Sequence, residues 1–527
     1  MRQADFVHLH VHSVYSILQS AIRLPQLLER ARSYRLPALA LTDHGNLFGA
    51  IEFYDQAYAL GIKPILGCEL GIDEGPAAEA GEMRSPRRAD HVVILAKNRR
   101  GYANLIRLLT LAHSKNWQGE PSVSRSLLLD HHQGLIVLSG CCRGDIAGCL
   151  LADDRERAQR RAARYLEVFG RDRFFIEVQP PLTDEHRRLN GALVDLARGM
   201  AIQVVATANS HLLDPDDREV LRILAALRQG VTLEEAAPLP TLAFPPPEAM
   251  KAEFAHLPEA IANTLAIAER CNVDLELGKI RLPRFPLSQG QTAQAALAEQ
   301  ARSGLGERLK KGAAPPLRYS QRLDRELEAV ERLALADYFL IVADFVRFAR
   351  ASGIQVGPGS GAAGMSLIAY ALGISDIDPV EHGLFFEHLL NLLRPETPDL
   401  DLGFAAEGRD EVYRHLRRTY GPERVAHIVS FGKIQTRSAL RDLARVLSLP
   451  GGDRERVDPG ESSAPPLSRE RLLRLEAVLE GLPRHVGTHA TGVVIGDGPL
   501  GEIVPLFRDS RGEWVSQFDM RALKRVG

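Results

Sequence analysis

The sequence predicts an α/β protein whose first part is a closed or nearly closed barrel of strands and helices. Seven short apolar runs punctuate the first 210 residues, and several of the longer stretches between them have the apolar spacing of a helix. The runs read FVHLHVH, ALALT, KPILGCELGI, HVVIL, GLIVLSG, FFIEVQ and IQVVATA. Strands that alternate with helices predict parallel pairing through crossover connections, and this number of strands favours closure into a barrel.

The composition is that of a soluble globular protein, with 527 residues of which 45% are hydrophobic and 25% charged. This length is too great for one core, so we expect two to four domains. The formal net charge of −2 excludes a global positive field, and any contact with nucleic acid needs a local basic surface. The five cysteines form no CxxC pair, and the chain shows neither an apolar signal segment nor a membrane-spanning run. We therefore expect a cytoplasmic location and no membrane partner.

Two segments interrupt the pattern of strands and helices. Residues 237–250, APLPTLAFPPPEAM, are rich in proline and predict a linker or an ordered loop. Residues 451–469 are polar and rich in glycine, proline and serine, which predicts a mobile loop. Helical periodicity dominates between these segments, from about residue 256 to residue 350. We expect a barrel domain over residues 1–236, followed by a linker and helical connection over residues 237–280.

Histidines are concentrated at the start of the chain. In FVHLHVHS, the side chains of His8, His10 and His12 share a face if the segment is a strand. Further residues that bind metals follow the later predicted strands: Asp43, His44, Glu69, His91, Cys141, Asn209 and His211. In a barrel of this kind the strand ends converge on one rim, where active sites form. Imidazole, thiolate and carboxylate together suit zinc, manganese or iron, so the pattern favours a metal site over scattered polar residues.

The segments FVHLHVHS and ALTDHGNL, with the ordered Glu, His, Cys and His after them, resemble the PHP (polymerase and histidinol phosphatase) domain. This domain opens the C-family bacterial DNA polymerases, which include the polymerase III alpha subunit and its error-prone relatives. The resemblance implies a distorted seven-stranded barrel that binds up to three metal ions, zinc or manganese, through nine residues. Seven of these positions match: His10, His12, His44, Glu69, His91, Cys141 and His211.

Two positions depart from the family pattern. Gln19 and Asn209 stand where the family commonly has aspartate. Each keeps a carbonyl oxygen that can bind a metal, so Asn209 counts among the candidate ligands, but each loses a negative charge. The affinity for at least one cation should therefore fall. The resemblance implies metal-dependent phosphoester hydrolysis, seen in this family as 3′–5′ exonuclease activity, in weakened form. In some relatives the domain is only structural.

The resemblance to C-family polymerases continues along the rest of the chain. DYFLIVADFVRFARASGIQVGPGSGAAG and LLRPETPDLDLGF are similar to the polymerase palm, and FGKIQTRSALRDLARVL is similar to its basic helical segment. PRHVGTHATGVVI and VSQFDM resemble the stretch before the last catalytic motif. These matches imply a mixed α+β palm over residues 281–425, a helical thumb-like insertion over residues 426–484 and a second, truncated palm segment over residues 485–527. We expect the fingers and C-terminal domains of the family to lie beyond this sequence.

The stretch PDLDLGF covers the acidic strand of the palm. Nucleotidyl transfer uses two divalent ions held by aspartates. By resemblance, Asp401 is the first catalytic ligand, whereas Gly403 stands at the second ligand position, and the third aspartate would follow Gly527. One carboxylate holds two ions poorly, so we expect Mg²⁺ to bind there weakly or not at all. We expect Asp399 to cap a strand or to face solvent.

The phosphate loop of the family is also altered. In GPGSGA, Ser360 and Ala362 stand where the family has arginine and serine. The bidentate cation is therefore missing. The backbone N–H groups of Gly359 and Gly361 remain available to bind phosphate.

A basic segment follows the acidic strand. Between Arg409 and Arg445, nine Lys or Arg residues stand against four Asp or Glu residues. Arg437 and Arg441 are four residues apart, so they share a face if this segment is a helix. Such a face can bind the phosphate backbone of DNA. The alternative is a solvated helix with intrahelical ion pairs.

Three functions remain open from the sequence. The first is a C-family DNA-directed DNA polymerase in replication or repair, with primer-template DNA as its partner. The second is a metal-dependent phosphoesterase or 3′–5′ exonuclease whose degenerate palm binds DNA. The third is a non-catalytic module that binds DNA, subunits of the replisome or a separate C-terminal half of the polymerase.

Overall fold

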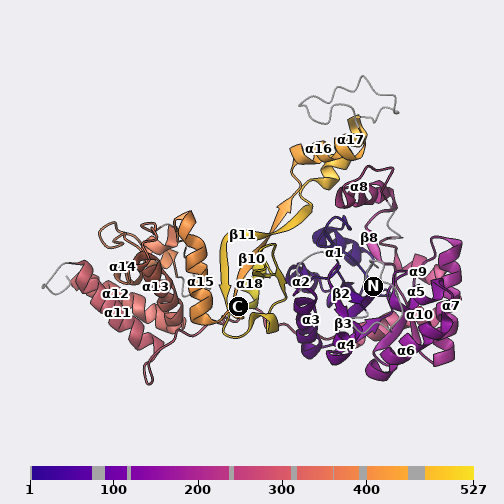
Figure 1. Cartoon of the computed structure of the whole chain (residues 1–527), viewed down its shortest axis with the longest axis horizontal. Helices are drawn as coiled ribbons and strands as arrows, with labels where there is room; N and C mark the ends of the chain where they lie inside the picture. The colour runs from indigo at the N-terminus through magenta and orange to yellow at the C-terminus, as the bar shows by residue number, and fades with distance from the viewer. Residues whose placement is uncertain are drawn as a thin grey trace. The chain divides into compact units, whose positions relative to one another are not determined.

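A computed structural model describes residues 3–73, 90–114, 120–236, 242–309, 317–359, 361–390, 400, 402–448 and 469–527. The chain forms two compact units, each assembled from separate segments. The first contains Met1–Leu275, His427–Gly492 and Gly501–Ala522, and the second contains Glu276–Ala426, Val493–Leu500 and Leu523–Gly527. In Figure 1 the N-terminal part of the first unit runs from indigo to magenta. The domain boundaries expected from the sequence stay a prediction.

The first unit contains a curled half-barrel sheet of seven strands, which confirms the predicted α/β fold class (Figure 1). The strands are β1 (Ala38–Leu41), β2 (Lys63–Asp73), β3 (Asp90–Ala96), β4 (Ser122–Ser124), β5 (Leu135–Leu138), β6 (Phe174–Val178) and β7 (Gln203–Ala206). They lie in the order β1-β2-β3-β5-β6-β7, and β4 pairs with β2.

One strand departs from the predicted parallel arrangement. β3 runs antiparallel to both of its neighbours, β2 and β5, whereas β1–β2, β5–β6 and β6–β7 are parallel pairs. Gly71 near the end of β2 therefore lies opposite His91 at the start of β3. This reversal brings the first residues of β3 to the edge where the parallel strands end.

The run FVHLHVH is extended but is not a strand of the sheet. Its backbone pairs on two sides: Thr42 N–H donates to the Val11 carbonyl, and His12 N–H donates to the Ser210 carbonyl, each over 2.9 Å. Ser210 begins β8 (Ser210–Leu212), which pairs with β9 (Leu242–Ala243) inside the proline-rich stretch. The predicted loop at residues 237–250 therefore contains a short strand, and residues 237–241 lie outside the described part.

Alternate residues of the strands meet in one buried core. Val93 and Leu95 of β3 and Ile136 and Leu138 of β5 pack there with Leu9 of the N-terminal segment. Helices surround the sheet: α1 (Leu24–Ser33), α2 (Ala50–Ala59), α3 (Arg99–Ala112), α4 (Arg125–Asp130), α5 (Asp145–Leu151), α6 (Arg155–Phe169), α7 (Asp184–Met200), α8 (Arg218–Gln229), α9 (Pro247–Glu253) and α10 (Pro258–Arg270). Because both faces of these strands are buried, only residues at their ends can reach a solvent-filled site.

Later segments of the chain complete the first unit. A four-stranded sheet has the order β11-β10-β13-β12, formed by β10 (Val425–Lys433), β11 (Pro483–Ile495), β12 (Leu506–Arg508) and β13 (Trp514–Ser516). Phe48 packs on Val429, Phe507 and Val515 of this sheet. The helices α16 (Thr436–Val446) and α17 (Arg469–Leu479) pack with α8 in another buried cluster. The predicted mobile loop falls almost wholly outside the described residues, because α17 begins at Arg469.

The second unit is mainly helical. Its core joins α11 (Ala293–Arg308), α12 (Leu317–Arg332), α13 (Ala336–Ala351) and α14 (Leu367–Ala371), and α15 (Arg409–Tyr420) packs on α13. The buried Glu326 carboxylate accepts hydrogen bonds from the backbone N–H groups of Leu367 and Ile368, at 3.0 and 3.1 Å. It thereby caps the start of α14, whose first N–H groups have no partner within the helix.

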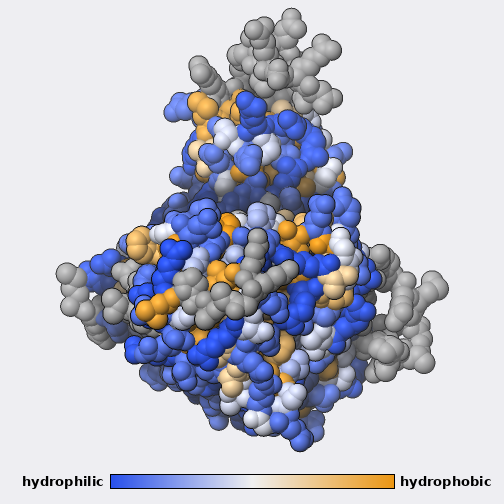
Figure 2. All heavy atoms as spheres, turned by 90° about the vertical axis from the view of Figure 1, so that its left-hand side faces the viewer, coloured by the Kyte–Doolittle hydropathy of each residue, from blue (hydrophilic) through white to orange (hydrophobic). Residues whose placement is uncertain are grey.

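Hydrophilic residues predominate on the face drawn in Figure 2, with hydrophobic residues scattered among them. Leu317 and Phe385 are the most exposed large apolar side chains of the described residues, at 71% and 66%. Among the helices of the described part, none has both the length and the apolar character needed to cross a membrane.

Candidate metal centre

The predicted ligands come together at one edge of the first unit. His10 and His12 lie on the N-terminal extended segment, His44 follows β1 and Glu69 lies in the second half of β2. The reversed β3 contributes His91 at its start, and the short β8 contributes His211. Six of the candidate ligands, from five segments, therefore meet here, and β3 arrives from the opposite direction.

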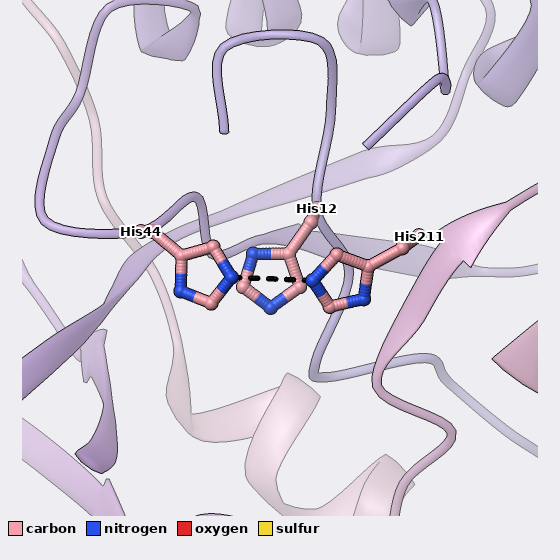
Figure 3. A group of neighbouring side chains, drawn as sticks. All are labelled: His12, His44 and His211. Carbon is pink, nitrogen blue, oxygen red and sulfur yellow. Dashed lines mark hydrogen bonds between the residues drawn. The ribbon is translucent and has the colours of Figure 1, made fainter. Parts of the chain in front are cut away.

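Three imidazole rings form the centre of the site. In Figure 3 the ring of His12 lies between those of His44 and His211. Its centroid is 4.1 Å from that of His44 and 4.0 Å from that of His211, in stacked geometry. The Nε2 atoms of His44 and His211 are 3.2 Å apart (Figure 3). Two ring nitrogens directed at each other over this distance share a proton or ligate a common cation.

Glu69 links the histidines. Its Oε2 atom lies 2.7 Å from His44 Nδ1, 3.5 Å from His12 Nε2 and 3.8 Å from His10 Nε2, and its Oε1 atom lies 3.1 Å from His91 Nδ1. Three groups of ligand atoms fall within 4.8 Å of one another: His12–His44–His211, His10–His12–Glu69 and His44–Glu69–His91. Ligands 2.0–2.2 Å from a tetrahedral ion are roughly 3.3–3.6 Å apart, close to several of these separations.

Unpaired buried atoms show that the site fits a metal. Among the described residues, the Nε2 atoms of His10 and His12 are buried and have no hydrogen-bond partner. Both residues belong with Glu69 to a single candidate ligand group. Leaving buried polar atoms unpaired costs about 1–3 kcal/mol each, and a cation at their common focus removes that cost.

Electrostatics keeps several ligands in the form that binds metal. Burial, with the neighbouring His211 and His44, holds the pKa of His12 well below its usual range, and burial lowers the pKa of His211 to about 3. Both rings are therefore neutral with a free lone pair at neutral pH. Burial alone would raise the pKa of Glu69, but His44 and His91 lower it well below the usual value, so the carboxylate is charged.

Glu177 supports the centre and was not predicted from the sequence. This buried residue of β6 contacts His10 Nδ1 over 2.7 Å and also accepts hydrogen bonds from Gln179 and Thr207. Burial lowers the pKa of His10, but Glu177 and Glu69 raise it to about 10. His10 must therefore lose a proton when a metal binds at Nε2. The one available signal was an acidic residue inside the apolar run FFIEVQ.

Other predicted ligands lie at the margin. Cys141 Sγ is 3.9 Å from Glu69 Oε1. Asn209 adopts a positive φ of 46°, and its carbonyl contacts His211 Nδ1 over 3.1 Å. His8 is not part of the cluster, since its Nε2 atom lies 2.9 Å from the Pro245 carbonyl and its ring stacks on Phe244. The three histidines of FVHLHVHS therefore do not share one site.

Asp43 has a structural role in the described contacts. Its carboxylate accepts hydrogen bonds from the backbone N–H and the hydroxyl of Ser13 and from the hydroxyl of Ser16, each over 2.7 Å. Ser16 Oγ in turn lies 3.1 Å from His12 Nδ1. Asp43 thus orients the loop that holds the His12 ring.

The centre opens into a cleft of about 1470 Å³ within the first unit. His44, Glu69 and His91 lie at one side of this cleft. The lining also includes residues of the second sheet and of the turn between β12 and β13, among them Arg484, Arg508, Arg511 and the acidic Asp509. The metal ligands therefore face a space wide enough for a substrate and bordered by charges of both signs.

The predicted palm residues are only partly described. Asp399, Asp401 and Ser360 lie outside the described residues. Gly403 is exposed, and its carbonyl accepts a hydrogen bond from Gly357 N–H over 2.8 Å. The predicted phosphate-binding residues Gly359 and Gly361 have positive φ values of 113° and 54°.

Arg437 and Arg441 lie on α16, as the helix prediction required. Both are exposed, whereas Ala439, Leu443 and Val446 of the same helix are buried against α8 and α17. Arg445 is 3.7 Å from Asp442, so part of the basic helix is engaged in an intrahelical ion pair.

Two protein families match the sequence. Residues 8–181 match the PHP domain, and residues 295–527 match the bacterial DNA polymerase III alpha NTPase domain. The chain is 32% identical to DNA polymerase III subunit alpha of Aquifex aeolicus and 36% identical to that of Thermus aquaticus, over 99% of this chain and 50% of each relative. The Escherichia coli K12 subunit is 34% identical over 100% of this chain and 47% of its own length. The chain thus spans about half the length of these relatives.

Solved structures give weaker matches. One is a putative metal-dependent phosphoesterase from Bifidobacterium adolescentis, with 15% identity, a TM-score of 0.25 and coverage of 39% of this chain and 87% of that chain. Another is a two-domain protein from Bacteroides vulgatus containing a predicted PHP-like metal-dependent phosphoesterase, with 15% identity, a TM-score of 0.21 and coverage of 40% and 55%.

Proposed function

The chain is related over its whole length to the alpha subunit of bacterial DNA polymerase III and carries a PHP domain, and we propose that its first unit is a metal-dependent phosphoesterase acting on DNA ends. The observation that carries the proposal is the cluster of ligand atoms around Glu69, with the buried Nε2 atoms of His10 and His12 unpaired among the described residues. Structural histidines normally have their polar atoms paired.

His10, His12 and Glu69 would hold one ion, and His44, His91 and His211 would complete the centre. When bound, Zn²⁺ or Mn²⁺ supplies a Lewis acid and lowers the pKa of a coordinated water. Glu177 fixes the ring of His10 through Nδ1, and Ser16 fixes the ring of His12 in the same way. Such contacts set which ring nitrogen carries the lone pair toward the ion.

A DNA strand is the substrate class that the cleft favours. Arg484, Arg508 and Arg511 are among its lining residues, and cations of this kind can contact the repeated phosphates of a strand. A 3′ end is the proposed point of cleavage, as the PHP domain implies, because an end can enter the cleft without a bend in the duplex.

The test is hydrolysis of a 3′-labelled single-stranded oligonucleotide by protein loaded with Mn²⁺ or Zn²⁺. His12→Ala should lose both bound metal and cleavage, because it removes a ligand atom from two of the candidate groups. His256→Ala is the matched control, since His256 is an exposed histidine of the same unit. Cleavage that persists unchanged in His12→Ala, after contaminating nuclease is excluded, would refute the proposal.

The second candidate function concerns the polymerase-like region. The relatives are named DNA polymerase III subunit alpha, and we propose that this chain alone extends primers poorly because Gly403 supplies no carboxylate. Mg²⁺ would be the metal of this region, with Asp401 as its catalytic ligand. Primer extension by the isolated chain that is abolished by Asp401→Asn would contradict the proposal.

DNA contact through α16 is a separate part of the proposal. Arg437 and Arg441 point to solvent from one exposed face, and no ion pair engages either of them within the described residues. Replacing both with alanine should weaken DNA binding and reduce the salt dependence by about two charges. Arg160 and Arg164 on α6 are an exposed pair with the same spacing and serve as the control. Equal losses in both double variants would contradict a specific contact. Subunits of the replisome remain the further partners proposed from the relatives.

A further inference from the structure

An ion-pair network borders the metal centre and involves residues that none of the candidate ligand groups contains. Glu120 accepts from Arg228 Nη2 at Oε1 and from Arg143 Nη2 at Oε2, each over 3.0 Å. Its Oε2 atom also lies 3.1 Å from His91 Nε2. The network therefore joins two guanidinium groups to a predicted metal ligand through one carboxylate.

This arrangement differs from an ordinary surface ion pair. The side chains of Arg143, Glu120 and Arg228 are 24%, 24% and 32% exposed, so water has only partial access to them. They come from the loop after β5, the segment before β4 and helix α8, which are distant in sequence. An exposed ion pair contributes about 0–1 kcal/mol to the free energy of unfolding. This is too little for stability alone to account for three segments that bring their charges to one place.

The charges within the network do not cancel. Two guanidinium groups share one carboxylate, which leaves an excess of one positive charge. Arg228 Nη1 also donates a hydrogen bond to the side-chain amide oxygen, Oε1, of Gln19, which is a neutral partner. In the described part of the chain, Arg228 is thus bonded through Nη1 and Nη2, and a guanidinium carries five N–H groups, so donors remain for a ligand.

One of the two guanidinium groups, that of Arg228, lies on the cleft. Gln19, Glu120 and Arg228 line the same space as His44, Glu69 and His91. An anion at the metal ligands would therefore have the Arg228 guanidinium beside it. Guanidinium groups match phosphate oxygens in geometry and form paired, charge-assisted hydrogen bonds with them.

We propose that Arg228, held by Glu120, binds the phosphate group of the ester that the metal centre cleaves. This inference rests on the proposed function and assigns its phosphate-binding residue. Glu120 acts as a positioning residue, because its carboxylate accepts a hydrogen bond from Arg228 Nη2 and another from Arg143 Nη2. The guanidinium group also favours charged substrates, because an uncharged ester would gain no binding energy from it.

The direct test measures the binding of inorganic phosphate to the zinc-loaded full chain by calorimetry. Arg228→Ala should weaken phosphate binding at least about tenfold, because it removes a charged hydrogen-bond donor pair. Arg228→Lys keeps the charge without the paired donors and should give an intermediate affinity. Arg222→Ala is the control, because Arg222 is exposed on the same helix and its Nη2 donates to the Leu233 carbonyl instead.

Zinc content and thermal unfolding of each variant show whether the centre and the fold are intact. Unchanged phosphate affinity in Arg228→Ala with zinc retained would overturn the inference, and so would a wild-type protein that binds no phosphate. If Arg228→Ala loses its fold, the affinity of Arg228→Lys alone decides, and an affinity equal to wild type overturns the inference.

The two proposals fail in different ways. Phosphate binding that depends on Arg228, in a protein that never cleaves DNA, would support the phosphate site and refute the hydrolase. Cleavage of DNA with the same KM in Arg228→Ala and wild type would support the hydrolase and refute the phosphate site. An increase in KM with kcat nearly unchanged is the result expected if both hold.

Discussion

The metal centre of the first unit depends on particular side chains, whereas the contact between Gly357 and Gly403 in the second unit does not. At the metal centre several ligands are held by other side chains, as Glu177 holds His10 and Ser16 holds His12. In the second unit the contact between Gly357 and Gly403 is made by the backbone alone. Where side chains support one another, replacing any one of them disturbs the site. A contact made by the backbone alone tolerates different residue types. This difference explains how the second unit can keep its fold while position 403 has no acid.

The largest effect should come from Glu69→Gln. This change removes the negative charge that faces four histidines while it preserves size, so metal content and hydrolysis should fall by more than about 100-fold. Metal analysis and single-turnover cleavage measure the two losses. Glu326→Gln is the matched change at a buried carboxylate of the second unit, and it should leave metal content and cleavage unaltered. Equal metal content in wild type and Glu69→Gln would contradict the claim that the metal centre depends on its side chains.

A smaller loss is expected for Glu177→Gln. The substitution keeps a hydrogen-bond acceptor near His10 Nδ1 but removes its charge, so the ring becomes a weaker ligand. Metal affinity should fall about 10–100-fold, the range for residues that orient a ligand. Competition with a chelator of known affinity measures the change. An unaltered affinity would show that His10 needs no support from this carboxylate.

The second unit can be tested at two glycines with different surroundings. A Cβ at Gly359 would lie 2.5 Å from Ser375 Oγ, and the φ of 113° disfavours other residues, so Gly359→Ala should cost about 1–3 kcal/mol. A Cβ at Gly403 would come no nearer than 3.9 Å to the Gly357 backbone, so Gly403→Ala should change stability by less than about 0.5 kcal/mol. Urea unfolding measures both. Comparable destabilisation would mean that position 403 is not free to vary.

The smallest effect concerns pH. Burial lowers the pKa of His113 to about 4, below its usual 6.5, so the unfolded chain binds a proton more readily than the folded one. The stability of the first unit should therefore fall as pH decreases from 6.5 to 4, and level off below 4 for this residue. His113→Gln should reduce the slope by up to about 1.4 kcal/mol per pH unit. Among the described residues, the buried histidines with a lowered pKa are His8, His12, His113 and His211, and all lie in the first unit, so acidification should unfold it at a higher pH than the second. An unchanged slope in the variant would contradict the assignment.

Local patterns in the sequence predicted most of the first sheet. Six of the seven apolar runs contain a strand, whereas FVHLHVH forms no strand and makes an isolated bridge from Val11 to Ser210 together with backbone hydrogen bonds to the segment of β1. The antiparallel direction of β3 was not predictable, since a run such as HVVIL has the same composition in either direction. It nevertheless places His91 correctly, because a reversed strand begins at the edge where its neighbours end.

The ligand set was predictable where chemistry follows a strand end, as for His44 and His211. Glu120, Arg143 and Arg228 were not, because each lies in a different segment and only the fold brings them together. Charged residues of that kind are common on surfaces, and nothing in their local sequence distinguishes them. Burial and shared partners are the signals that a sequence alone lacks.

The first unit is interrupted in the sequence, and this affects how it forms during synthesis. The apolar face of α8, with Val220 and Leu224, is covered by Leu443 of α16 and Leu475 of α17. At about 5–20 residues per second, the ribosome needs roughly 10–50 s to make the covering helices after α8 has emerged. During that interval the nascent chain presents an uncovered hydrophobic surface, which is a binding site for chaperones. A recombinant fragment that ends at Leu275 would keep that surface permanently and should aggregate.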